Sequence, residues 1–279
     1  MSVQPRALPA FRPSPGQLAV ITFLGIVLLA GWPLMLVAST DHRDVVLAVV
    51  PGIAALALAR LEGPGVLRRL GLDRLGWPDA YLIAIWAPTL FAVGRVALVL
   101  ATGAGRLDAD VGGLHPASGA PPDGEAVQRL VGAILLVPIA GAFAMVGAEI
   151  GWRAYVLTRL MPLGSWRAVT LTSLLWWAWQ APFRIDTASD RWILDVASLL
   201  VWCVLVGEIL GWLYLRTRSV WAPALFSAAI AATAYLPTAV LRDLAPDAAA
   251  SFGPAALAAP ALMVLIVRLR SRGEIEPGA

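Results

Sequence analysis

The sequence is poor in charged residues and contains no lysine at all. Only 14% of its 279 residues are charged, while 59% are hydrophobic. An ordinary soluble domain is about one quarter charged and about half apolar, and a soluble chain this apolar would expose large hydrophobic patches and aggregate. Lipid is the solvent for the outward face of a membrane protein. The composition therefore excludes a typical soluble domain and predicts an integral membrane protein.

All 21 basic residues are arginines, and they lie between apolar runs rather than in a patch with interleaved aromatic residues. The net charge of +3 and the sequence pI of about 9.6 therefore indicate no nucleic-acid partner. The single cysteine, Cys203, lies in an apolar run and cannot form an internal disulfide. We expect it to be a small buried side chain.

Eight apolar runs are candidates to cross the membrane, which takes about 20 helical residues. They are Leu18–Ser39, Val45–Arg60, Ala80–Thr102, Val127–Gly147, Ala168–Pro182, Ile193–Leu215, Val220–Leu241 and Pro254–Leu269. The second, fifth and eighth runs are short and could be thin or partly re-entrant segments.

The arginines alternate in number from one connecting segment to the next. With the N-terminus inside, the cytoplasmic segments hold 14 arginines and the outer ones hold 6, and Arg95 falls within the third span. This is the bias of the positive-inside rule. The sequence therefore predicts an all-α polytopic helical bundle of about eight spans, N-in and C-in, in a cell membrane. We expect that membrane to be the bacterial cytoplasmic membrane.

Three regions divide the chain. Residues 1–126 hold the first three spans and an outer loop, residues 127–241 hold a core, and residues 242–279 hold the last span and a cytoplasmic tail. The outer loop Gly103–Glu125 is rich in glycine, proline and aspartate, as flexible connections are. We expect the first span to be a retained anchor, because it is long and lacks a clear cleavage site.

Ionisable residues inside apolar runs are costly in a bilayer and are the first candidates for function. They are Arg95, Glu149, Arg153 and Glu208. Glu149 and Arg153 are four residues apart, which places them on one face of a helix in the favourable order for an ion pair. Two interpretations stay open: a functional pair, or a pair at a helix end that extends to the cytoplasmic interface.

The other two buried charges have structural alternatives. Glu208 lies between Gly207 and Gly211, where helices pack closely, and it could pair with Arg153 or Arg95 or face a water pocket. Arg95 could donate to backbone carbonyls that a nearby proline leaves free.

Three segments carry a recognisable pattern. The first is Gly-Ala-Glu-Ile-Gly-Trp-Arg-Ala-Tyr at 147–155, the second is Trp-Trp-Ala-Trp-Gln-Ala-Pro-Phe at 176–183, and the third is Gly-Trp-Leu-Tyr-Leu-Arg-Thr-Arg-Ser-Val-Trp-Ala-Pro at 211–223, running on to Ser227 and Ala231. Their order, spacing and flanking residues resemble the CPBP intramembrane proteases, also called CAAX-prenyl-protease-like proteins. The resemblance covers residues 147–231 and implies an intramembrane endopeptidase fold.

The departures from the family pattern fall on the residues that the resemblance makes catalytic. Ala148 stands where the family has its first glutamate, Gln180 and Ser227 stand where it has two histidines, and Ala231 replaces an asparagine or aspartate. The acid Glu149 and the base Arg153 are kept. Glu149, Arg153, Gln180 and Ser227 are thus the vestigial catalytic positions.

Peptide hydrolysis needs a base for water and a group that stabilises the oxyanion. The two histidines, His42 and His115, map to outer loops, so no intramembrane imidazole is available. Neighbouring helical residues point about 100° apart, so we expect Glu149 not to aim where an acid at 148 would. Ser227 would need an adjacent base to act as a nucleophile, and no histidine or lysine supplies one. Zinc is the metal that the resemblance implies, but we predict neither a metal site nor a cofactor.

The sequence therefore predicts a degenerate family member that binds without cleaving. Its expected partners are the lipid bilayer and a prenylated peptide, a transmembrane peptide or another membrane protein. The tryptophans Trp152, Trp176 and Trp179 are candidate substrate-binding residues, with an aromatic belt and core packing as the alternative. Two other functions remain open. One is an active endopeptidase using Glu149 with Gln180 and Ser227, and the other is a transporter whose path holds Arg95, Glu149 and Glu208. The absence of an internal repeat argues against transport.

Overall fold

The computed structural model describes residues 14–108, 131–185, 188–234, 236–245, 248 and 252–270. His115 and most of the loop Gly103–Glu125 lie outside the described residues. In chain order the elements are α1 Pro15–Val37, α2 Thr40–Leu61, α3 Val66–Arg69, α4 Pro78–Ala101, β1 Arg106–Leu107, η1 Gly132–Leu136, α6 Val137–Glu149, η2 Ile150–Leu157, α7 Thr158–Leu160, η3 Met161–Leu163, α8 Ser165–Arg184, α9 Trp192–Thr217, α10 Trp221–Thr233, α11 Leu236–Val240, β2 Leu241–Arg242 and α13 Pro254–Arg270.

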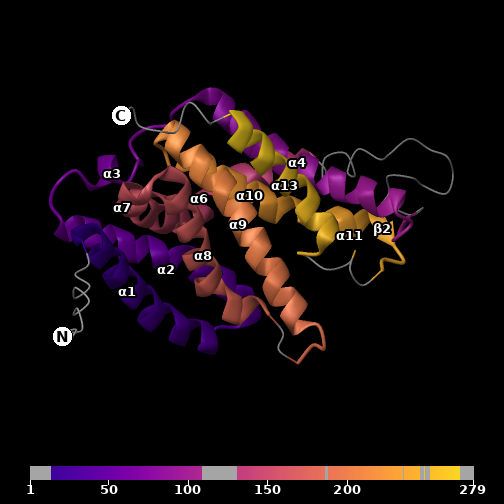
Figure 1. The fold of residues 1–279 in the computed structure, drawn as a ribbon, viewed down its shortest axis with the longest axis horizontal. Coiled ribbons are helices and arrows are strands. Elements are labelled where there is room, and N and C mark those ends of the chain that lie inside the picture. Colours follow the sequence, from indigo (N-terminus) through magenta and orange to yellow (C-terminus); the bar gives the residue numbers. More distant parts are fainter. Residues whose placement is uncertain are drawn as a thin grey trace, which may run out of the picture.

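The prediction of an all-α bundle of membrane-spanning helices is confirmed (Figure 1). Among the described residues, six helices are long and apolar enough to cross a membrane. They are Pro15–Val37, His42–Leu61, Pro78–Ala101, Ile134–Leu163, Trp192–Thr217 and Trp221–Val240. The fifth and eighth predicted spans form α8 and α13, but α8 is less apolar and α13 has only 17 residues. The chain is thus a multi-pass membrane protein, and the count of eight stays a prediction.

Two predicted boundaries are wrong. The fourth span does not end at Gly147, because the helix continues through η2 to Leu163. The motif at 147–155 therefore lies within a long apolar helix and not at its end. His42 lies in the first turn of α2 rather than in a loop, where its Nδ1 is 2.6 Å from the Ser39 hydroxyl oxygen.

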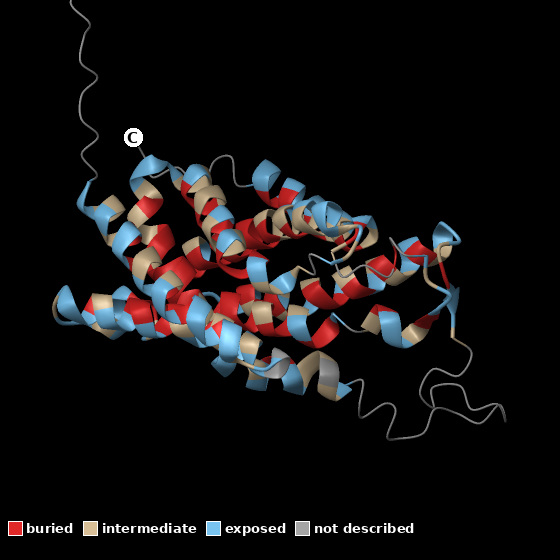
Figure 2. Cartoon of the chain, turned by 90° about the horizontal axis from the view of Figure 1, so that it is seen from below, coloured by how far each residue is buried: buried red, intermediate tan, exposed pale blue. Residues whose placement is uncertain are grey.

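Helix packing brings distant parts of the chain together. α10 lies between α4 and α6, while α8 packs on α9 and η2 and α13 packs on α4 and α9. Figure 2 shows buried residues gathered on the inward faces and exposed ones on the outside. Many exposed side chains are large and apolar, as a lipid-facing surface requires. β1 and β2 form a two-residue antiparallel pair that joins the ends of α4 and α11.

Small residues let α2 approach α6 and η2 closely. A Cβ added at Gly147 would lie 2.6 Å from the carbonyl oxygen of Ala48, and one added at Gly151 would lie 2.6 Å from Cβ of Pro51. Membrane helices pack through such small residues because backbones can then touch. The contact holds α2 against the helix that carries Glu149.

Proline in α2 leaves one backbone carbonyl without its helical donor. Pro51 has no N–H, so the carbonyl of Leu47, four residues earlier, loses its usual partner. The indole Nε1 of Trp179 donates to this carbonyl at 3.5 Å, and the indole of Trp32 donates to the Trp179 carbonyl at 3.2 Å. Side chains of neighbouring helices often satisfy such freed groups in membranes. These two bonds tie α8 to α1 and α2.

Candidate functional site

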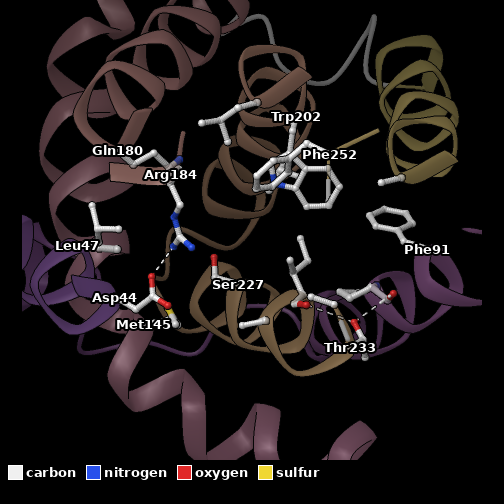
Figure 3. A pocket seen from close by; sticks show the side chains of 18 of the residues that line it. Asp44, Leu47, Phe91, Met145, Gln180, Arg184, Trp202, Ser227, Thr233 and Phe252 are labelled. Carbon is white, nitrogen blue, oxygen red and sulfur yellow. Dashed lines mark hydrogen bonds and ion pairs between the residues drawn. The ribbon is translucent and has the colours of Figure 1, made fainter. Parts of the chain in front are cut away.

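The motif positions of the sequence come together around one cavity of about 410 Å³ (Figure 3). Ala148 and Glu149 reach it from α6, Gln180 from α8, and Ser227 and Ala231 from α10. The chain thus brings together side chains that lie more than 80 residues apart in the sequence. The spatial convergence that the resemblance implies is present.

Glu149 forms the buried polar floor of this cavity. Its carboxylate lies 3.2 Å from Nε of Arg153, and its Oε1 accepts a hydrogen bond of 2.8 Å from the Ser227 hydroxyl. Both members of the ion pair are only 2% exposed as side chains. The interpretation of a helix-end pair that reaches the interface is therefore wrong.

Positions 148 and 149 both line the cavity. Glu149 reaches the Ser227 hydroxyl at 2.8 Å although it is one position beyond the family's first acid. α6 ends at Glu149, and the next eight residues, Ile150–Leu157, form a π-helix. A π-helix bonds residue i to i+5, and such turns recur at functional sites.

Arg153 is buried behind the floor and is incompletely bonded. Its guanidinium carbon lies 4.8 Å from the centroid of the Trp176 ring, in cation–π contact. Among the described residues, neither Nη1 nor Nη2 of Arg153 has a hydrogen-bond partner. The Arg153 charge therefore serves mainly to balance the charge on Glu149.

Gln180 lines the same cavity and is also buried. Its amide nitrogen Nε2 donates to Sγ of Cys203 at 3.0 Å. Cys203 is a fully buried free thiol, as its apolar surroundings in the sequence predicted.

Aromatic side chains make a large part of the remaining cavity wall apolar. Phe91, Trp176, Trp202 and Phe252 all line the cavity, and the rings of Trp202 and Phe252 pack with centroids 5.7 Å apart. Such a combination of apolar walls with a few convergent polar groups is typical of ligand sites.

The tryptophans expected to bind substrate lie in different places. Trp176 lies on the cavity wall. Trp152 and Trp179 are almost fully buried in the packed core with α1 and α2, and neither is among the described residues that line the cavity. Trp152 packs edge-on against Phe23 with centroids 5.5 Å apart.

The remaining buried charges have partners that the sequence did not indicate. Arg95 lines the cavity and donates from Nη2 to the Ala248 carbonyl at 2.8 Å. Glu208 pairs with neither Arg153 nor Arg95. It accepts hydrogen bonds from Arg268 of α13, whose Nε lies 2.8 Å from Oε2 of Glu208. Glu208 is outside the cavity lining, so the three charges of the transport hypothesis do not share one path.

The third motif shapes the turn that places Ser227. Helix α9 ends at Thr217, and Arg218 follows in the left-handed region with φ of 54°. Ser219 then donates to the Arg74 carbonyl at 2.7 Å, and the Trp221 indole donates to the Leu72 carbonyl at 3.2 Å. These bonds fix the start of α10, two turns before Ser227.

The residues around Glu149 do not fit the zinc that the resemblance implies. Zinc in proteins takes histidine, cysteine or carboxylate ligands, usually three or four of them. In the part of the chain that the structure describes, no three histidine, cysteine, aspartate or glutamate side chains are grouped to hold a metal ion. Of the five motif positions in the site, only Glu149 carries such a side chain, because the others are Ala148, Gln180, Ser227 and Ala231.

Fold and cavity together define a multi-pass membrane protein with a buried polar site inside its helical bundle. The sequence profile of the family described as Type II CAAX prenyl endopeptidase Rce1-like matches residues 130–233. The match spans all the positions that carry the resemblance, and it confirms the CPBP-family resemblance. Among curated proteins, none matches the chain.

Proposed function

We propose that this protein is a pseudoprotease of the CAAX-protease-like type, which binds an apolar peptide in the cavity without hydrolysing it. The observation that carries the proposal is the state of Glu149. Its carboxylate is held by Arg153 at 3.2 Å and by the Ser227 hydroxyl at 2.8 Å. The Glu149 side chain is only 2% exposed and its Oε1 already accepts a hydrogen bond, so a water molecule has little access to it as a base.

The rest of the site supports binding over chemistry. Loss of one oxyanion donor alone lowers a rate by about 100- to 1,000-fold, and here alanine, glutamine, serine and alanine stand at the four matched positions. The cavity of about 410 Å³ and its aromatic walls remain large enough for an apolar side chain or a prenyl group. A scaffold that keeps its cavity and has lost its reacting groups is suited to holding a ligand.

Purified protein in lipid nanodiscs tests the proposal with fluorescently labelled prenylated CAAX peptides and transmembrane reporter peptides. We expect binding without cleavage. The variant Ala231→Trp fills the cavity and should weaken binding at least tenfold. Val201→Trp, on the exposed face of α9, is the matched control and should bind normally. Cleavage by the native chain that disappears in Glu149→Gln would overturn the proposal.

A variant that restores the family's catalytic residues tests whether the native site has lost only its reacting groups or also their geometry. Glu at 148 with His at 180 and 227 reinstates the family's residues on the same scaffold. If cleavage appears only in this variant, the native site lacks the reacting groups and keeps the geometry.

One observation favours a second candidate function, an active hydrolase. The sequence offered no base for Ser227, but the structure places the Glu149 carboxylate 2.8 Å from its hydroxyl oxygen. A serine beside a carboxylate can act as a nucleophile if the carboxylate takes its proton. A fluorophosphonate probe that labels the native chain and not Ser227→Ala would establish this function in place of the first.

A further inference from the structure

The cavity has an exposed end, and an ion pair lies across it. Asp44 of α2 and Arg184 of α8 both line the cavity, and Nη2 of Arg184 lies 2.6 Å from Oδ1 of Asp44 (Figure 3). Their side chains are 61% and 38% exposed, whereas Glu149 at the other end is 2% exposed. We name this end, defined by Asp44 and Arg184, the mouth.

The mouth belongs to one side of the bundle. Asp44 lies near the start of α2 and Arg184 is the last residue of α8. Arg95 lies in the last third of α4, and Ala234 follows the end of α10. Phe252 lies just before the start of α13. Every helix that lines the outer part of the cavity therefore contributes residues from the same end of the bundle.

Arginines collect at the opposite end of these helices, on what we name the arginine face. Its members are Arg60, Arg68, Arg69, Arg74, Arg159, Arg167, Arg216, Arg218, Arg268 and Arg270. Contacts across this face show that its segments lie together. Arg159 pairs with Glu62 at 2.5 Å, and a Cβ at Gly16 would lie 3.1 Å from the Arg159 carbonyl oxygen. By the positive-inside rule this face lies in the cytoplasm.

We infer that the ligand enters the cavity from the non-cytoplasmic side of the membrane, through a mouth that the Asp44–Arg184 pair closes. The inference rests on the proposed function for the ligand, an apolar peptide segment. Such a segment must then be presented outside the cytoplasm, by an exported protein or by the outer end of a transmembrane helix. An ion pair this exposed is weak, so the entering peptide can displace it readily.

Thiol labelling from either side of the membrane tests the side of entry. Ala231→Cys places a thiol on an exposed part of the cavity wall, and Arg167→Cys places one on the arginine face. The native chain gives the background, because its single cysteine is fully buried. A charged, membrane-impermeant methanethiosulfonate is added to intact cells and to inside-out vesicles.

We expect Ala231→Cys to react in intact cells and Arg167→Cys to react only in inside-out vesicles. The prenylated peptide added outside should slow the reaction of Ala231→Cys. Reaction of Ala231→Cys only in inside-out vesicles overturns the inferred side of entry. The labelling experiment does not depend on cleavage, so the inferred side of entry can fail while the proposed function stands. Conversely, peptide cleavage by the native chain would refute the proposed function and leave the labelling result unchanged.

The closing role of the ion pair has its own readout. Adding Asp44→Asn to Ala231→Cys should speed labelling from outside by up to about fivefold, the most that an exposed pair contributes. A control at a carboxylate outside the cavity lining, Asp195→Asn in the first turn of α9, should leave the rate unchanged. Equal labelling rates with and without Asp44→Asn would refute the proposal that the ion pair closes the mouth.

Discussion

Removing Arg153 should destabilise the protein far more than removing the ion pair as a whole. At the 3.2 Å between Arg153 Nε and Glu149 Oε2, two unit charges attract by ~5 kcal/mol at an effective dielectric constant of about 20. Arg153→Met leaves the Glu149 carboxylate buried with one hydrogen bond, from Ser227. Leaving one charge of a buried pair alone costs about 3–5 kcal/mol.

The neutral double variant should recover most of that loss. Glu149→Gln with Arg153→Met removes both charges and keeps the volumes, and such replacements are often neutral within about 1 kcal/mol or stabilising. Unfolding in mixed detergent micelles, followed by tryptophan fluorescence, gives the free energies of the two single variants and the double. We expect a coupling free energy of about 3 kcal/mol between the two sites.

The exposed pair at the mouth is the matched control. Arg184→Met removes the same kind of charge from a pair whose side chains are 38% and 61% exposed, and it should cost at most about 1 kcal/mol. A loss below 1 kcal/mol for Arg153→Met, or equal losses for Arg153→Met and Arg184→Met, would refute the assignment of Glu149 as a buried charge held by Arg153.

Three further outcomes follow from contacts described above. Trp179→Phe removes the donor to the Leu47 carbonyl and should lower the free energy of unfolding by about 1 kcal/mol; an unchanged value would show that the carbonyl finds another donor. Gly147→Ala places a Cβ 2.6 Å from a carbonyl oxygen of α2 and should cost about 1–3 kcal/mol, measured by thermal unfolding, whereas a stabilised variant would contradict the close contact. Arg268→Ala leaves Glu208 buried without its ion-pair partner and should cost more than the double variant with Glu208→Gln, and equal losses would argue against the pair.

Local sequence patterns were enough to predict the helices and the groups that meet in the site. Long apolar runs gave the spans because a bilayer leaves the helix as the way to satisfy the backbone. The resemblance of the three motifs to the CPBP proteases implied that Ala148, Gln180, Ser227 and Ala231 meet in one site, and all four line the same cavity. Cys203 was expected to be buried because its neighbours along the chain are apolar, and it is.

Contacts that depend on how distant helices sit could not be predicted. Glu208 was expected to pair with Arg153 or Arg95 or to face a water pocket, but its partner Arg268 lies 60 residues further along the chain, on a helix whose packing no motif records. The ion pair of Asp44 and Arg184 likewise joins two helices that are far apart in the sequence. A charge near the end of an apolar run is the only signal that either pair left in the sequence.

The local helix type could not be predicted either. The pairing of Glu149 with Arg153 was expected from α-helical spacing, whereas η2 is π-helical from Ile150. The glycines at 147 and 151 mark close approach of α2, but a π-helix has no comparably clear sequence signature.

The two indole hydrogen bonds at Trp179 restrict the motion of α8 near the mouth. Trp179 is tied to the Leu47 carbonyl and to the indole of Trp32, so α8 is anchored up to that residue. Pro182 then interrupts the helix before its last residue, Arg184, and proline is a common point of bending. We therefore expect the end of α8 that carries Arg184 to bend more readily than the part held by Trp179. A proline-free variant, Pro182→Ala, should stiffen this end and slow the exchange of ligand without altering the cavity floor.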